Sequence, residues 1–542
     1  MTDVDRVFIV NGQPFFPVGG QSRNSSGYNA AEAEAAFRAV ELIHGNTLEI
    51  PVYWEQIEPE EGRFDFASVD ALLESARRHG VRLVLLWFGT WKNGDMDYTP
   101  AWVKTNPERF RRVTSPTGKR VWVLSSHCQA NWEADRRAFC ALCEHLAARD
   151  STECTVIALQ IENEPGILGS DRDYGPEGQA AFERPVPAEL VARMKEAGRG
   201  PVYEQWQAAG GREAGSWPEL FGWAAGELMS AWSIATYIDG LAEGGKAIYD
   251  IPMYVNVWLG EGGWAVAGET YPSGGAVSKV LDVFKWFTPH VDLIAPDIYV
   301  ADSRGYEQIC ATYARDDNPL FVPESGPGGS NTWNMFRAVA GYNAIGYAFF
   351  AVEHVLAEDG VSVNPDHQPL VDSIRCLAAA APLLLRYQGT GKIHAVVQEE
   401  HVQSQRLPLD GWLGLVEFGE GTMHWRPKDW RHRPERRPGL EQADGKRGRG
   451  LVVQAGRNEF YLVGANYRLL LRPLLPPEQA LDVTVAGDFL LTRQAQYVSV
   501  EEGHLDGDGA FVVERRRNGD EVDGGVWVEP DSGVVRVILS QA

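Results

Sequence analysis

Cysteine is scarce in this chain, which has six among 542 residues. They are scattered, and a disulfide scaffold in a chain of this length would need many more. Cys140 and Cys143 form a CxxC, but the surrounding stretch WEADRRAFCALCEHLAARD has a helical pattern, and no second pair lies at metal-ligand spacing. The sequence therefore predicts neither a disulfide framework nor a bound metal ion.

Long apolar runs and an excess of positive charge are also missing. No uninterrupted run is long enough to span a bilayer, and the N-terminal MTDVDRVFIVNG has no signal-peptide core, so we expect a cytoplasmic protein, or a periplasmic one if a leader was removed. The formal net charge is -24. Nucleic acids and anionic membranes would repel such a chain, so neither is expected as a partner. With no P-loop, calcium loop or dinucleotide fingerprint, we expect no cofactor.

What the chain does have, from about residue 5 to residue 390, is an alternation of short β-rich runs and amphipathic helical stretches. VRLVLLWFG and similar runs are apolar almost throughout, which is typical of parallel strands buried on both faces. Eight strands with intervening helices predict a (β/α)8 TIM barrel over residues 1–390. The predicted strands lie around residues 15–20, 47–53, 82–88, 155–161, 252–258, 292–299, 320–324 and 345–351.

Residues 391–542 have a different texture, with short β-rich runs divided by Gly, Asp and Asn, and they predict an antiparallel β-sandwich accessory domain. The Arg-rich segment 426–450 inside it is interpreted as a solvated loop, with a binding patch as the alternative. Within the barrel, residues 167–217 form a long loop after the fourth strand, on the face where barrel active sites lie. We expect this loop to form a wall of the substrate site, with an oligomer contact as the alternative.

Two motifs at predicted strand ends carry the chemistry. ALQIENEPG ends the fourth strand with Glu162, Asn163 and Glu164, and LFVPESGPGG ends the seventh with Glu324. Retaining glycoside hydrolysis needs a neutral carboxyl to protonate the departing oxygen and an ionised one to attack the anomeric carbon, ~5–5.5 Å apart. Either motif alone could be an ordinary acidic loop, but together, with PDIY ending the sixth strand, they indicate a glycosidase. For Glu162, a substrate contact and a structural salt bridge are both open.

These motifs resemble the large clan of retaining glycosidases that share this barrel. QIENEPG is similar to the QxENEYG of family 35 β-galactosidases, and YWEQIEPEEGRFDF is similar to a stretch found in families 35 and 42. The resemblance implies that Glu164 is the acid/base and Glu324 the nucleophile. It implies that Asn163 binds the sugar 2-hydroxyl and that Tyr299 donates a hydrogen bond to Glu324, favouring its ionised form. Burial and the Glu324 charge are expected to raise the pKa of Glu164.

The chain departs from the family 35 pattern at some positions. Glu55 and Ile57 replace the Asn and His of W-N-x-H-E-P, VLLWFGTWKNG replaces the sugar-gripping motif of strand three, and the cysteine zinc cluster of family 42 has no counterpart. The leading hypothesis is an exo-acting β-galactosidase that cleaves terminal β-galactosides from oligosaccharides. The alternatives are a retaining β-glucosidase, β-mannosidase or endo-glycanase of the same clan, and a non-catalytic carbohydrate-binding protein. A homo-oligomer is compatible with the sequence.

Tryptophan is plentiful, with 18 residues, and indole faces stack on the apolar faces of sugars. Several lie at or just past the ends of predicted strands, where they are expected to line the substrate cleft, although core packing is the alternative for each. These candidate platforms are Trp54, Trp87, Trp91, Trp258, Trp264 and Trp333. Glu353 and His354, after the eighth strand, are further candidates for substrate contact.

Overall fold

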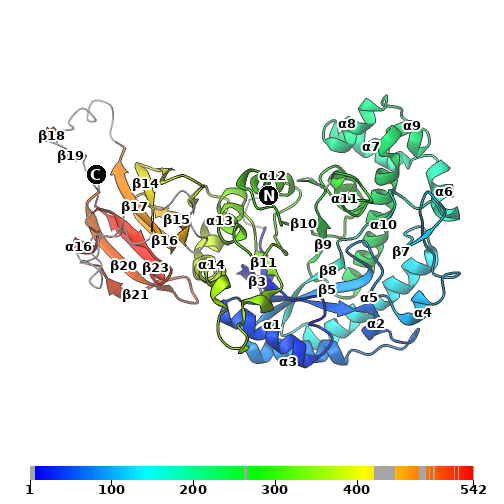
Figure 1. The fold of residues 1–542 in the computed structure, drawn as a ribbon, viewed down its shortest axis with the longest axis horizontal. Helices are drawn as coiled ribbons and strands as arrows, with labels where there is room; N and C mark the ends of the chain where they lie inside the picture. Colours follow the sequence, from blue (N-terminus) through cyan, green and yellow to red (C-terminus); the bar gives the residue numbers. More distant parts are fainter. Residues whose placement is uncertain are drawn as a thin grey trace.

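A computed structural model describes residues 6–261, 265–419, 446–474, 484–486, 489–491, 495–517, 519–522 and 524–540. Its helix-rich N-terminal part and its β-rich C-terminal part lie side by side (Figure 1). Trp264 and residues 426–445 of the Arg-rich segment lie outside the described residues.

The N-terminal part contains a curled parallel sheet of seven strands in the order β10-β9-β8-β5-β4-β3-β11. Residues 320–325 close the remaining gap, because isolated parallel bridges join Val322 to Tyr347 and Ser325 to Ile298. Pro319 and Pro323 lack the N–H that a continuous ladder requires, which explains why this seventh segment pairs only at single residues. The TIM-barrel prediction is confirmed. The strands are β3 (Val18–Gln21), β4 (Thr47–Tyr53), β5 (Arg82–Lys92), β8 (Val156–Asn163), β9 (Met253–Trp258), β10 (Leu293–Asp297) and β11 (Tyr347–Phe350).

Helices cover the outside of this sheet (Figure 1). The Asn29 side chain accepts hydrogen bonds from the first free N–H groups of α1, and Gly80 ends α3 in the left-handed conformation at φ 65°. The helices of this layer are α1 (Ala30–Leu42), α2 (Trp54–Ile57), α3 (Ala67–His79), α4 (Ala101–Lys104), α5 (Gln129–Asp150), α10 (Ala225–Ile248), α11 (Leu281–Phe287), α12 (Ser303–Tyr313), α13 (Asn331–Tyr342) and α14 (Gln368–Tyr387). A small hairpin, β6 (Arg112–Thr114) with β7 (Arg120–Leu124), precedes α5.

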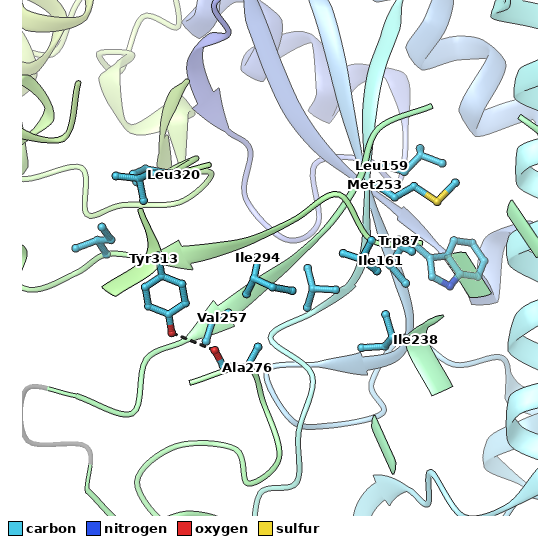
Figure 2. Packing of buried hydrophobic residues seen from close by; sticks show 14 of the residues in the cluster. Trp87, Leu159, Ile161, Ile238, Met253, Val257, Ala276, Ile294, Tyr313 and Leu320 are labelled. Carbon is cyan, nitrogen blue, oxygen red and sulfur yellow. Dashed lines mark hydrogen bonds between the residues drawn. The ribbon is translucent and has the colours of Figure 1, made fainter. Parts of the chain in front are cut away.

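The barrel strands are buried on both faces. Outward residues such as Trp87, Ile161 and Met253 pack against the helical layer, as Figure 2 shows. Inward residues form a separate cluster, which includes Phe321 and is closed at one end by the hairpin of β1 (Phe8–Val10) and β2 (Gln13–Phe15). Phe8 packs edge-on against Phe321, with ring centroids 5.3 Å apart. Because this end is filled, polar chemistry is confined to the opposite, C-terminal end of the strands.

The long segment after β8 folds into short helices, α6 (Pro176–Glu183), α7 (Ala188–Ala197), α8 (Pro201–Ala208) and α9 (Trp217–Phe221). The helices α7 and α8 contact α11, and α9 contacts α10. In Figure 1 these three lie together at the edge of the barrel far from the β-rich part. The insertion thus rests on the outer helical layer, and its expected role as a wall of the substrate site stays a prediction.

The C-terminal part is built from antiparallel sheets in the orders β12-β15-β16-β23-β20-β21 and β13-β14-β17-β22, which enclose their own apolar cluster. The β-sandwich prediction is confirmed. The strands are β12 (Ile393–Val397), β13 (Ser404–Leu409), β14 (Trp412–Phe418), β15 (Arg449–Gly456), β16 (Glu459–Ala465), β17 (Tyr467–Pro473), β20 (Tyr497–Leu505), β21 (Phe511–Arg516), β22 (Val526–Val528) and β23 (Val534–Leu539). A hairpin of β18 (Thr484–Ala486) with β19 (Phe489–Leu491) and the short α16 (Gly519–Val522) complete the described elements.

Helix α14 joins the two parts. By length and composition residues 365–387 are apolar enough to cross a membrane, but half of this stretch is buried inside the protein, where α14 contacts β3, β15 and β16. Its apolar face is therefore accounted for by packing between the barrel and the sandwich. Arg449 of β15 is buried against the same helix, where it donates from Nε to Ser373 Oγ (2.6 Å) and from Nη2 to the Pro369 carbonyl (3.0 Å).

Replacing Arg449 by Met should loosen this joint. The variant removes the buried charged donor to the Ser373 hydroxyl and to the half-buried Pro369 carbonyl, so we expect a loss of about 2–3 kcal/mol in the free energy of unfolding, measured by urea denaturation. Arg406→Met, on the exposed face of β13, is the matched control and should change stability by less than about 0.5 kcal/mol. Equal stability of the two variants would contradict the role assigned to Arg449.

Candidate active site

Three carboxyl side chains converge at the C-terminal end of the barrel. Glu164 follows β8, Asp297 ends β10 and Glu324 lies on the segment that closes the sheet. All three are buried, and one oxygen of each lies within 4.8 Å of the others. This spacing is much closer to the ~5–5.5 Å of retaining glycosidases than to the ~6.5–9.5 Å of inverting enzymes. The structure thus brings together the two predicted carboxyls and adds a third.

The backbone that presents Glu164 is held in an uncommon conformation. Glu162 and Glu164 both have positive φ, 61° and 46°, which costs a non-glycine residue on the order of 1 kcal/mol or more. Two hydrogen bonds maintain it: the Glu164 N–H donates to Asn256 Oδ1 (2.8 Å), and the Asn93 N–H donates to the Asn163 carbonyl (3.0 Å). The carboxyl of Glu164 is therefore aimed by its neighbours on β9 and after β5.

Glu324 is held by two donors from different strands. Gln21, at the end of β3, donates from Nε2 to Oε2 (2.8 Å), and the Tyr299 hydroxyl donates to Oε1 (2.5 Å). Donors to both oxygens stabilise a carboxylate and fix its orientation. The Tyr299 contact is the one that the resemblance implied. Gln21 was not singled out in the sequence, although it is a polar residue that ends an apolar strand.

Burial and the charge of Glu324 raise the pKa of Glu164 to about 7, against the opposing influence of Lys92 and of a hydrogen bond with Asp297. Two ionised carboxylates ~4 Å apart repel by about 4 kcal/mol at an effective dielectric constant of 20. The arrangement consequently favours a protonated Glu164 beside Glu324. This direction is the one expected from the sequence.

Asp297 is the main residue that sequence reasoning missed. It stands two positions before Tyr299 in PDIY, and it accepts a hydrogen bond from Asn256 Nδ2 (2.7 Å). Burial and the charges of Glu324 and Glu164 raise the pKa of Asp297 well above its usual range. The oxygens of the three carboxyls are close enough to ligate a metal ion, and the raised pKa of Asp297 favours retention of a proton in the cluster.

Asn163 is fully buried beside this cluster. Neither its side-chain oxygen nor its side-chain nitrogen has a hydrogen-bond partner among the described residues. A buried amide without partners is costly unless a ligand supplies them. Its donor and acceptor are thus suited to a bound hydroxyl group.

Glu162 lies in a second pair of buried acids. Its Oε2 accepts a hydrogen bond from the Trp91 N–H (2.7 Å), and its carboxyl pairs with that of Asp135 on α5. Asp135 also accepts from Trp87 Nε1 (2.9 Å) and from the Tyr237 hydroxyl (3.1 Å). Burial and the Asp135 charge raise the pKa of Glu162, which favours a proton on this pair. Glu162 forms no salt bridge with a described residue, so that interpretation is wrong, and the substrate contact stays a prediction.

Four of the proposed tryptophan platforms are buried. Trp54, Trp87 and Trp91 are fully buried, because they pack into the layer between the strands and the helices. Trp333 is buried as well, and the Arg447 guanidinium lies 4.2 Å from its ring centroid. These contacts favour core packing for the four indoles, and sugar stacking by them stays a prediction. Trp258, at the end of β9, is partly exposed and stays a candidate.

Glu353 is occupied by protein groups. Its carboxylate accepts hydrogen bonds from the Arg23 N–H (3.1 Å) and from Ser26 Oγ (2.5 Å), and it lies 3.8 Å from the Arg23 guanidinium. These contacts join the end of β11 to the loop after β3. His354, which follows it, is exposed. Glu353 therefore has a structural explanation. Neither Glu353 nor His354 contacts the three carboxyls.

Two family models match the sequence. One, described as Beta-galactosidase and belonging to glycoside hydrolase family 42, matches residues 28–196, and one, a domain of unknown function (DUF5597), matches residues 371–529. The first includes Glu164 and ends before Glu324. The second begins inside α14 and covers most of the sandwich. No curated protein matches.

Solved structures with a similar outline include a β-galactosidase from Bacillus circulans sp. alkalophilus and a family 42 β-galactosidase from G. stearothermophilus. Each is 15% identical and covers 68% of this chain and 57% of its own, with TM-scores of 0.47 and 0.48. The catalytic domain of a β-amylase from Paenibacillus polymyxa is 11% identical, with 66% and 96% covered and a TM-score of 0.48. The chain thus spans little more than half the length of the two β-galactosidases. The matching family model is that of family 42, so family 35 is not supported, and residues 28–196 are similar to the β-galactosidases of family 42.

Proposed function

We propose that this protein is a retaining, exo-acting β-galactosidase with Glu164 as acid/base and Glu324 as nucleophile. The observation that carries the proposal is the pair of buried carboxyls, with oxygens within 4.8 Å, at the mouth of a barrel whose residues 28–196 match a β-galactosidase family model. Either carboxyl alone would fit many folds. Together they supply both groups that double displacement requires.

The reaction follows from the hydrogen bonds. Protonated Glu164 gives its proton to the glycosidic oxygen while the Glu324 carboxylate, held by Gln21 and Tyr299, attacks the anomeric carbon. The aglycone leaves and a glycosyl ester on Glu324 remains. Glu164, now a carboxylate, takes a proton from water, whose oxygen attacks the anomeric carbon and releases Glu324. Asn163, with its unpartnered amide, is proposed to bind the sugar 2-hydroxyl and stabilise the transition state.

The identity of the sugar that the enzyme cleaves is a separate and more specific part of the proposal. Galactose is supported by the description of the matching family model, and a terminal β-galactoside is the substrate class we propose. A related retaining activity on β-glucosides, β-mannosides or internal linkages would use the same two carboxyls, so the sugar has to be tested separately from the mechanism.

Removing the nucleophile should abolish turnover. On a panel of nitrophenyl β-glycosides, we expect Glu324→Ala to lower kcat/KM by more than about 10³-fold on every substrate that the wild type cleaves, because no ester can form. Glu358→Ala, an exposed glutamate after β11, is the control and should match the wild type. A preference of the wild type for the β-galactoside would support galactose as the sugar of the substrate. Activity of Glu324→Ala equal to that of the control would refute the assignment of Glu324 as the nucleophile.

Removing the acid should discriminate between leaving groups. We expect Glu164→Ala to slow hydrolysis of alkyl galactosides and disaccharides by about 10²–10⁴-fold, because their oxygens need protonation. Glycosylation by dinitrophenyl galactoside needs little protonation, so a burst of released phenol should persist, and azide should accelerate turnover by replacing water as the nucleophile. An equal loss on both substrate classes would count against the acid/base role.

The pH profile should have an alkaline limb set by Glu164. Its pKa is raised to about 7, so its proton is present below that pH and is lost as the pH rises through it. We therefore expect kcat/KM to fall about tenfold per pH unit above this point. The measurement is kcat/KM from pH 5 to pH 9 on a substrate with a poor leaving group. The same limb persisting in Glu164→Gln would assign it to another group.

A further inference from the structure

The double-displacement mechanism assigns no role to Asp297, the third carboxyl of this site. Its surroundings determine the direction of each hydrogen bond it makes. The Glu164 N–H donates to Asn256 Oδ1, so the amide nitrogen of Asn256 must point the other way, and it donates to Asp297 Oδ2 (2.7 Å). Oδ2 of Asp297 is thereby an acceptor.

The other oxygen, Oδ1, is buried and accepts a hydrogen bond from no donor in the described part of the chain. One oxygen of Asp297 lies within 4.8 Å of an oxygen of Glu164, and a hydrogen bond between two carboxyl groups needs a proton on one of them. An ionised Oδ1 would be buried without a donor, whereas a protonated Oδ1 can donate to Glu164. The geometry therefore favours the proton on Asp297.

The charged and titratable groups that face Asp297 favour the same state. Three are acids, from β8, from the segment 320–325 and from β4, and three are tyrosines, which are neutral at physiological pH. They are Glu164, Glu324, Glu49, Tyr254, Tyr299 and Tyr313. The cation at this end of the barrel, Lys92, acts on Glu164. A negative charge on Asp297 would be repelled by its acidic neighbours.

We propose that Asp297 is a positioning residue that stays protonated and donates a hydrogen bond from Oδ1 to the carboxyl of Glu164 throughout the reaction. This inference rests on the proposed function, since it gives Glu164 the acid/base role. When Glu164–H gives its proton to the glycosidic oxygen, the C–O electron pair leaves with the aglycone and Glu164 becomes a carboxylate. The Asp297 hydroxyl then bonds to this carboxylate. In the second step water returns a proton to Glu164, and Asp297 keeps its own.

Two substitutions of Asp297 distinguish a neutral hydrogen-bond donor at this position from an ionised carboxylate. In Asp297→Asn the amide can still accept from Asn256 and donate to Glu164, so we expect kcat/KM within about threefold of the wild type and an unmoved alkaline limb. In Asp297→Ala the donor is lost, so we expect at least about a tenfold fall in kcat/KM and an alkaline limb about one pH unit higher. Asp302→Asn, at the N-cap of α12, is the control for an Asp-to-Asn change and should match the wild type.

The proposal is overturned if Asp297→Asn is as impaired as Asp297→Ala, or if its alkaline limb falls by about one unit, as removal of a negative charge would cause. A second measurement does not depend on turnover. The infrared difference spectrum between the wild type and Asp297→Asn at pH 7 should contain the carbonyl stretch of a protonated carboxylic acid, and its absence also overturns the proposal. If no glycoside is cleaved but the band is present, the proposed function fails while the proton on Asp297 stands.

Discussion

The crowding of buried carboxyl groups at one end of the barrel is the constraint around which this site is organised. Glu164, Asp297 and Glu324 have oxygens within 4.8 Å of one another and are almost removed from solvent. Three negative charges cannot coexist at that distance in a medium of low polarity. Protons must be retained on part of the cluster, and the neighbouring donors determine where. Glu324 accepts from two donors, whereas Asp297 accepts from one, Asn256, and its other oxygen has no donor among the described residues.

One amide connects the parts of this arrangement. Asn256, at the end of β9, accepts from the backbone of Glu164 and donates to Asp297, so it fixes the left-handed turn of one residue and the acceptor oxygen of the other. The sheet that carries these residues is rigid, because its inner face is filled and its other end is closed by the β1–β2 hairpin. A filled barrel restricts movement of the strand ends. The hydrogen-bond distances at the site are therefore maintained within tenths of an ångström, as proton transfer requires.

A second pair of acids supports the same strand from outside. Glu162 and Asp135 lie beneath the helical layer, where burial and their mutual charge raise the pKa of Glu162, and the Trp87 indole donates to Asp135. This pair gives the first residue of the ENE motif a structural environment of its own. The Trp87 N–H is committed to the same buried carboxyl. The tryptophans near the strand ends serve mainly to pack the helices against the barrel.

The sequence by itself determined the (β/α)8 order, the sandwich after it and the strand ends at which Glu164 and Glu324 stand. Apolar runs of strand length and their helical spacers are local patterns, and parallel strands necessarily meet at one edge. Only the tertiary structure decided which polar residues face that edge. Asp297, Asn256 and Gln21 lie on different strands, and Glu162 turns away from Glu164 through two left-handed residues, against simple alternation. Side-chain direction at a strand end depends on backbone torsions and cross-strand hydrogen bonds, which the linear pattern does not contain.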